Sequence, residues 1–138
     1  MRTISFINLK GGVAKTISAI NVAFVLAAVY HYRVLLIDCD KQANSTKFFG
    51  LHDYTAPSLA DVLTIKGINI ERVIRKTEYE RLDLLPANMA LLRANKEVLM
   101  DCSRPQQTRL ARALETVSGQ YDFCVIDNPP DINMGTIN

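Results

Sequence analysis

Apolar and polar positions divide the chain into short runs that are typical of strands and longer stretches that are typical of helices. The strand-like runs, rich in β-branched and aliphatic residues, fall at residues 3–8, 33–38, 82–86 and 121–127. The helix-like stretches fall at residues 15–29, 58–63, 70–77, 87–100 and 106–118. Strands that alternate with helices predict crossover connections, and therefore an α/β fold with a mostly parallel sheet flanked by helices.

Some of these segments predict more than their secondary structure. Residues 33–38 (RVLLID) are a continuous apolar run, which is typical of a strand buried on both faces of a parallel sheet. Residues 17–30 (ISAINVAFVLAAVY) are very hydrophobic, yet they are shorter than the roughly 20 residues that a membrane span needs. We expect this helix, apolar nearly all round, to be sandwiched in the core. Ser58, with Asp61 three residues later, predicts the N-cap of the helix at 58–63.

Composition adds bounds to this picture. The chain has 138 residues, 49% hydrophobic and 22% charged, which suits one soluble domain over residues 1–138. A net charge of +2 does not indicate a nucleic-acid surface. Arg104, Arg109 and Arg112 do gather on or beside one predicted helix, where a solvated face is the ordinary interpretation. The odd number of cysteines, 3, without C-x-x-C spacing, and the lack of a signal-peptide pattern favour a reducing cytoplasm.

Polar residues stand where three of the predicted strands end. Asn8 leads into a glycine-rich loop, and Asp38 and Asp127 each follow an apolar run. Ligands of open parallel sheets bind beyond the carboxyl ends of the strands. The sequence therefore predicts a ligand site at this edge of the sheet.

The loop after the first strand, NLKGGVAKT at residues 8–16, has the residue types of a phosphate cradle. Gly11 and Gly12 let the backbone curl and approach a ligand closely. Backbone N–H groups at the start of the following helix can hold phosphate oxygens. Lys15 can reach the β- and γ-phosphates, and the Thr16 hydroxyl can ligate Mg²⁺.

The strand-end acids complete this chemistry. Asp127 can hold Mg²⁺ opposite Thr16, usually through water. Asp38 and Asp40, in the sequence DCD, would face the same side of an extended strand, so one can support the Mg²⁺ shell while the other orients an attacking water. A solvated acidic turn and a strand-end cap are the alternatives for these carboxylates.

Four segments, in the same order and at similar separations, resemble the ParA/Soj family of DNA-partition ATPases: KGGVAKT, RVLLIDCDKQANST, LDLLPAN and YDFCVIDNPP. The family belongs to the P-loop group with a deviant Walker A motif, whose signature lysine is matched by Lys10. MinD cell-division ATPases, nitrogenase iron protein and several ATP-dependent biosynthetic enzymes are in the same group. The resemblance covers essentially the whole chain and implies a P-loop NTPase fold.

The resemblance also implies a role for each matching residue. Lys10 and Asp40 are expected to be catalytic: Lys10 reaches across an ATP-sandwiched dimer, and Asp40 positions the hydrolytic water. Thr16, Asp38 and Asp127, the Walker B acid, are expected at the metal. The nucleotide contacts are expected from a continuous run, namely Lys10, Gly11, Gly12, Val13, Ala14, Lys15, Thr16 and Ile17.

From the same resemblance we expect an MgATP-binding ATPase that dimerises on ATP and acts in plasmid or chromosome segregation. Its cofactors are ATP and Mg²⁺, and its partners are a second copy, a partition protein of the ParB/Spo0J type and non-specific DNA, with no membrane contact. A cytoplasmic, nucleoid-associated protein is implied. Two alternatives are an ATP-dependent, amide-forming biosynthetic relative and a nucleotide-binding regulator that does not hydrolyse ATP.

The sequence departs from the family at two loop residues and in its length. Ala14 replaces the usual glycine, which costs about 1 kcal/mol or more if that residue needs a positive φ. Ile17 stands where the family usually has a second hydroxyl residue. The chain is also about half the family's length, and we expect it to be an N-terminal portion cut after the Walker B strand, with much of the DNA contact in the missing part.

Overall fold

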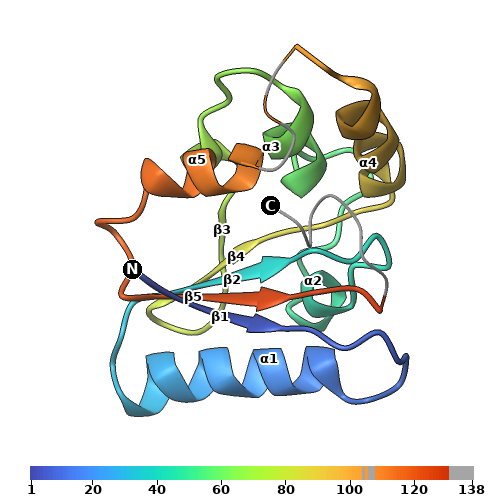
Figure 1. The fold of residues 1–138 in the computed structure, drawn as a ribbon. Helices are drawn as coiled ribbons and strands as arrows, with labels where there is room; N and C mark the ends of the chain where they lie inside the picture. The colour runs from blue at the N-terminus through green and yellow to red at the C-terminus, as the bar shows by residue number, and fades with distance from the viewer. Residues whose placement is uncertain (104, 106–107, 131–138) are drawn as a thin grey trace.

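The computed structural model describes residues 1–103, 105 and 108–130. A five-stranded sheet runs through the molecule in the order β1-β5-β2-β4-β3 (Figure 1). Its strands are β1 (Arg2–Phe6), β2 (Val34–Asp38), β3 (Arg75–Lys76), β4 (Leu82–Leu85) and β5 (Phe123–Asp127). Every neighbouring pair is parallel except β3 with β4, which is antiparallel. The predicted α/β fold with a mostly parallel sheet is confirmed.

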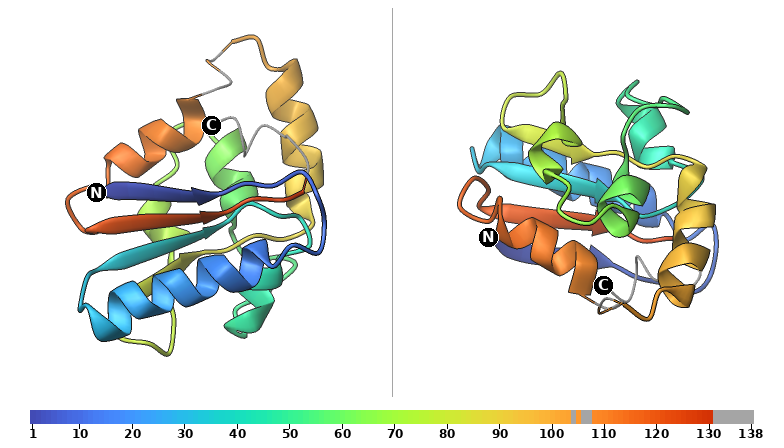
Figure 2. Two further views of the ribbon diagram at one scale, coloured as in Figure 1. Left: turned by 60° about the horizontal axis from the view of Figure 1, so that its bottom comes forward. Right: turned by 90° about the horizontal axis from the view of Figure 1, so that it is seen from above.

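Helices cover both faces of this sheet. They are α1 (Lys15–Phe24), which a π-helical segment (Val25–Val29) continues, α2 (Asn44–Phe48), α3 (Leu59–Thr64), α4 (Ala90–Met100), α5 (Arg109–Glu115) and a 3-10 turn (Ile70–Arg72). Figures 1 and 2 show α1 against one face of the sheet and α3, α4 and α5 against the other. No helix in the described ranges is both long and apolar enough to cross a membrane.

The central strand β2 joins two hydrophobic clusters. Its side chains alternate between the faces of the sheet, as strand geometry requires. Leu35 and Ile37 lie in the cluster with α3, α4 and α5, whereas Val34 and Leu36 lie in the cluster with α1. All five residues of β2 are buried, so the predicted doubly buried strand is confirmed.

The strand register brings the carboxyl ends of three strands to one level. In β5, Asp127 is opposite Phe6 of β1 and Asp38 of β2. The loop that leaves β1 therefore begins beside the two strand-end carboxylates. The strand register thus brings Asp38, Asp127 and the start of the glycine loop to the same edge of the sheet.

Local signals place the start of α3 as predicted. The Ser58 hydroxyl accepts a hydrogen bond from the backbone N–H of Ala60, 3.3 Å away, and Asp61 accepts one from the Ser58 N–H at 2.8 Å. These reciprocal bonds form a capping box at the N-terminus of α3.

The prediction of a helix over residues 70–77 is wrong beyond its first turn. The 3-10 turn ends at Arg72, and β3 then pairs with β4. Lys76 lies opposite Asp83 in this ladder, and its Nζ atom is 2.8 Å from the Asp83 carboxylate. Pairing with the edge of the sheet therefore prevails over the local helical pattern.

The expectation that the first helix is sandwiched in the core is also wrong. Ala19, Ile20 and Ala23 are buried against the sheet, but Ile17 is 51% exposed and Val29 is 60% exposed. No described element covers the outer side of α1, so its apolar residues there face solvent. Within the predicted helix over residues 106–118, the structure describes α5 (Arg109–Glu115), which ends before residue 118; residues 106 and 107, and Arg104 of the predicted turn, lie outside the described residues.

Candidate functional site

A pocket of about 470 Å³ opens at the carboxyl edge of the sheet. It is lined by Gly11, Gly12, Val13, Ala14, Lys15, Thr16, Ile17, Asp40, Asn44, Asn128 and Pro130. These residues come from the loop between β1 and α1, from the segment after β2, and from the end of β5. The predicted nucleotide-binding run from Gly11 to Ile17 thus lies on one pocket together with Asp40.

The backbone of the glycine loop takes left-handed conformations at two positions. Gly12 has φ 72°, and Ala14, the residue before α1, has φ 59° and ψ 23°. A Cβ added at Gly12 would meet no atom within 4 Å, so the positive φ and not crowding favours glycine there. Ala14 therefore occupies a conformation that costs a residue with a Cβ about 1 kcal/mol.

Helix α1 begins at the pocket without a side-chain cap. Its first intrahelical bond runs from the Ser18 N–H to the Ala14 carbonyl, 2.9 Å away. The N–H groups of the first turn therefore keep the donors and the partial positive charge that suit a phosphate. Lys15 adds a full charge at this position, and its Nζ donates to the Lys10 carbonyl at 3.3 Å.

Asp127 lies beneath the loop and is buried. One carboxylate oxygen accepts a hydrogen bond from the Ser45 hydroxyl at 2.7 Å, and the other, Oδ1, has no hydrogen-bond partner among the described residues. Burial raises the pKa of Asp127, whereas Ser45 and Thr16 lower it. A buried carboxylate oxygen with unused lone pairs, close to a threonine hydroxyl, is suited to a cation.

Asp38 is held differently. One oxygen accepts bonds from the Thr46 N–H and hydroxyl, at 2.9 and 2.7 Å, and the other accepts from the Asp40 N–H at 3.1 Å. Burial nevertheless raises the pKa of Asp38 to about 7. Because both oxygens already accept hydrogen bonds, Asp38 is suited to fix the segment that carries Asp40, and its contact with a metal stays a prediction.

Asp40 reaches the pocket and is only partly buried. Its Oδ1 accepts a hydrogen bond from the Gln42 N–H at 2.9 Å, which fixes the turn after β2. Lys10 is exposed and does not line the pocket. The structure thus places Asp40 with the nucleotide loop and leaves Lys10 at the surface beside it.

The sequence analysis missed α2 and its two hydroxyl residues. Ser45 and Thr46 are fully buried, and Thr46 also accepts a hydrogen bond from the Ala87 N–H at 3.0 Å, after β4. Asn128 was missed as well: its side chain donates to the Ser5 hydroxyl at 2.8 Å and to the Phe6 carbonyl at 3.2 Å. Hydroxyl residues soon after the DCD sequence were the available signal for Ser45 and Thr46.

Comparisons with known proteins show the family of the chain. The AAA domain family matches residues 1–138. The sporulation initiation inhibitor protein Soj of Bacillus subtilis is 36% identical over 137 residues, which is 99% of this chain and 53% of Soj. A ParA family protein of Chlamydia muridarum is 39% identical over 132 residues, 96% of this chain and 51% of that protein.

Solved structures share the fold. Cobyrinic acid a,c-diamide synthase from Mycobacterium smegmatis, with a bound ATP analog and magnesium, matches with a TM-score of 0.86 and 34% identity. The match covers 100% of this chain and 55% of that chain. The chain therefore spans about half the length of the relatives that it matches.

Proposed function

Since the chain belongs to the AAA domain family and is a relative of the ParA and Soj proteins, we propose that the intact protein is an MgATP-dependent partition ATPase. In this proposal residues 10–17 hold the phosphates, with Lys15 on the β- and γ-phosphates. The segregation of a plasmid or a chromosome is the process in which it acts, as a cytoplasmic, nucleoid-associated protein.

The observation that carries the proposal is the pairing of an uncapped helix N-terminus with a buried acid below it. Lys15 and Thr16 open α1 at the rim of the pocket, and Asp127 presents an unbonded Oδ1 beneath them. A bound triphosphate would supply negative charge at the N-terminus of α1, and its cation would supply positive charge at the Asp127 carboxylate. No other place in the described chain combines an uncapped helix N-terminus with a buried carboxylate oxygen that lacks a hydrogen-bond partner.

The residues fit Mg²⁺ as the cation. The ion keeps several waters and takes only one or two carboxylates beside the phosphates of its nucleotide. The described residues hold no group of three or more His, Cys, Asp and Glu side chains around a metal-sized site, as expected for an ion shared with a nucleotide. Thr16 and Asp127 would hold it, and Mg²⁺ would neutralise charge on the transferred phosphoryl group.

Turnover is assigned to Asp40 and Lys10. Asp40 lines the pocket and would orient the attacking water. The exposed Lys10 would contact the phosphates of a second copy, so hydrolysis requires an ATP-dependent dimer. A partner of the ParB/Spo0J type and non-specific DNA are proposed to act on the intact protein.

Calorimetry of MgATP binding to the intact protein tests the assignment. Lys15→Ala should abolish measurable binding, because it removes the charge that meets the β- and γ-phosphates. Lys47→Ala is the matched control, since Lys47 is exposed on α2 and does not line the pocket. Equal affinities for the wild type and Lys15→Ala would remove the basis of the proposal.

The diamide synthase structure supports a second candidate, an ATP-dependent amide-forming enzyme. Stimulation of ATP hydrolysis distinguishes the two. A partition ATPase should respond to DNA and a small basic partner protein, whereas a biosynthetic enzyme should respond to an acid metabolite and an amide donor.

The strained Ala14 supports a third candidate, a nucleotide-binding regulator that does not hydrolyse ATP. A steady-state release of phosphate by the wild type that disappears in Asp40→Ala would exclude this candidate.

A further inference from the structure

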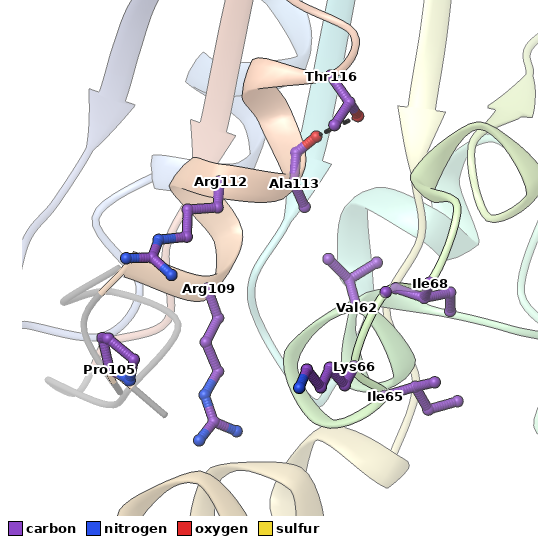
Figure 3. A pocket seen from close by; sticks show the side chains of 10 residues that line it. Val62, Ile65, Lys66, Ile68, Pro105, Arg109, Arg112, Ala113 and Thr116 are labelled. Carbon is purple, nitrogen blue, oxygen red and sulfur yellow. Dashed lines mark hydrogen bonds between the residues drawn. The ribbon is translucent and has the colours of Figure 1, made fainter. Parts of the chain in front are cut away.

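A second pocket lies between the end of α3 and α5 (Figure 3). Both helices cover the face of the sheet opposite α1 (Figure 1). The volume of this pocket is about 460 Å³, similar to that of the nucleotide pocket. It is lined by Val62, Ile65, Lys66, Gly67, Ile68, Pro105, Arg109, Arg112, Ala113 and Thr116. None of these residues lines the nucleotide pocket, so the two are separate sites.

One side of this pocket is apolar. Figure 3 shows Val62, Ile65 and Ile68 on one wall and Ala113 on the facing wall, which α5 provides. Ile65 is 51% exposed although it is a large aliphatic residue. An apolar surface in a concavity of this size is typical of a small-molecule site and not of an ordinary solvated surface.

The same pocket carries positive charge, and none of its lining residues in the described part of the chain is acidic. The buried Arg109 already has partners within the protein. Its guanidinium donates to the Leu63 carbonyl at 3.0 Å and to the Asp101 carboxylate at 2.8 Å. Lys66 and Arg112 are exposed and form no ion pair with any described residue. Arg112 follows Arg109 by one helical turn, which places both on the same side of α5 (Figure 3).

We propose that this pocket binds a small organic anion, with an apolar body against the isoleucine wall and a carboxylate or sulfonate head between Lys66 and Arg112. Lys66 and Arg112 are exposed, so the apolar wall supplies the contact area and the two cations supply the preference for a negative head. Arg109 holds α3 and α5 together and thereby fixes the distance between the walls.

The chemistry favours a singly charged head over a polyphosphate. The pocket lies at the carboxyl end of α3, where backbone carbonyls carry partial negative charge. Its lining has a single glycine, Gly67, and only the short helix α5 begins there, at Arg109, whereas the nucleotide pocket combines paired glycines with the start of the longer α1. ATP therefore belongs to the first pocket, and an amphiphilic monoanion suits the second.

Amide NMR on the intact protein, saturated with MgADP so that the nucleotide pocket is filled, tests the proposal with naphthalene-1-sulfonate. The signals of residues 65–68 and 113–116 should shift on titration. Naphthalene-1-methanol is the neutral probe of nearly the same shape. Its affinity should be at most about one tenth of that of the sulfonate, because it lacks the charge. Equal binding of the two probes, or shifts confined to other residues, would overturn the proposal.

Two double variants complete the test. Lys66→Gln with Arg112→Gln should weaken sulfonate binding about ten-fold, whereas Arg93→Gln with Lys96→Gln, which removes the same charge from α4, should leave it within about two-fold. The first pair makes no side-chain hydrogen bond with another described residue, so its thermal midpoint should equal that of the wild type. Equal weakening in both variants, or a short DNA duplex that shifts the same amides more strongly than the sulfonate, would refute a small-molecule site.

Discussion

The glycine loop and the acid cluster beneath it meet at one pocket but are built in opposite ways. The loop at residues 8–14 is exposed throughout, and Gly12 and Ala14 are held at positive φ. The cluster of Asp38, Asp127, Ser45 and Thr46 is buried, and short hydrogen bonds between side chains hold it together. The loop offers its backbone N–H donors to solvent, whereas the cluster keeps its carboxylates away from solvent.

This difference assigns ligand affinity to the loop and to the unbonded oxygen of Asp127, and stability to the rest of the cluster, namely Asp38, Ser45 and Thr46. Loop residues make few contacts that folding depends on, so changes there should act mainly on binding. The cluster residues tie β2, β5 and α2 to the segment after β4 through the Thr46 hydroxyl and the Ala87 N–H. Changes at Asp38, Ser45 or Thr46 should therefore alter the free energy of unfolding before they alter the chemistry.

The largest expected effect is a loss of stability as pH rises. Burial raises the pKa of Asp38 from 3.8 to about 7, so between these values the folded protein binds more protons than the unfolded chain. The free energy of unfolding should therefore fall from about pH 4 to pH 7 and level off above it, by on the order of 4 kcal/mol at about 1.4 kcal/mol per pKa unit. Asp127 contributes in the same direction, because burial also raises its pKa.

Urea unfolding at a series of pH values measures this slope. Asp38→Asn should flatten it, whatever the stability of the variant itself, because the amide does not titrate. A loop variant such as Lys10→Gln should keep the wild-type slope, since Lys10 is exposed. If the slope were equally steep in Asp38→Asn, the cluster would not be the titrating region.

The next effect is that of Thr46→Val, which keeps the shape of the side chain but removes its hydroxyl. The Ala87 N–H would lose its acceptor, and the Asp38 carboxylate would lose a donor at 2.7 Å, both inside the protein. Leaving buried groups unsatisfied should cost about 2–3 kcal/mol. Thr3→Val, on the exposed edge strand β1, is the control and should change the stability by less than about 0.5 kcal/mol.

The urea concentration at the midpoint of unfolding distinguishes Thr46→Val from Thr3→Val. MgATP calorimetry shows whether a loss of stability also lowers the affinity for MgATP. Thr46→Val should bind MgATP within a few-fold of the wild type under conditions where both are folded. A variant as stable as the wild type would show that the cluster is not a stabilising unit, and the contrast with the loop would fail.

The same contrast explains what could be predicted from the sequence. The strands and the site residues of the loop follow from local patterns, since a continuous apolar run such as residues 33–38 specifies a buried strand by itself. Helix α2 could not be predicted, because its five residues, Asn44–Phe48, are too short for a periodic signal. It is held by the bonds of Ser45 and Thr46 to acids on β5 and β2, which are contacts between distant parts of the chain.

Edge pairing and backbone angles escaped prediction for similar reasons. The two residues of β3 owe their conformation to β4, and the ion pair of Lys76 with Asp83 forms only once the two strands are adjacent. Whether Ala14 needs a positive φ depends on how the loop turns back toward the sheet, which no neighbouring residue specifies. The structure answers that question with φ 59°.

The smallest expected effect is that of Ala14→Gly, which relieves the strained loop position. Glycine adopts a positive φ without the Cβ penalty, so the free energy of unfolding should rise by about 0.5–1 kcal/mol. MgATP affinity should change by less than about three-fold, because the substitution removes one methyl group and leaves every backbone N–H group and charge of the loop in place. Unfolding in urea and calorimetry measure the two quantities.

Ala43→Gly and Ala19→Gly sharpen this last prediction. Ala43 also has a positive φ, 55°, but it is fully buried beside the acid cluster, so the lost methyl contacts should offset the relief and leave a smaller gain than at Ala14. Ala19 lies inside α1, where glycine should cost about 1 kcal/mol or more. If Ala14→Gly instead tightened MgATP binding ten-fold, the Cβ of Ala14 would itself oppose nucleotide binding, and the strain would act on affinity as well as on stability.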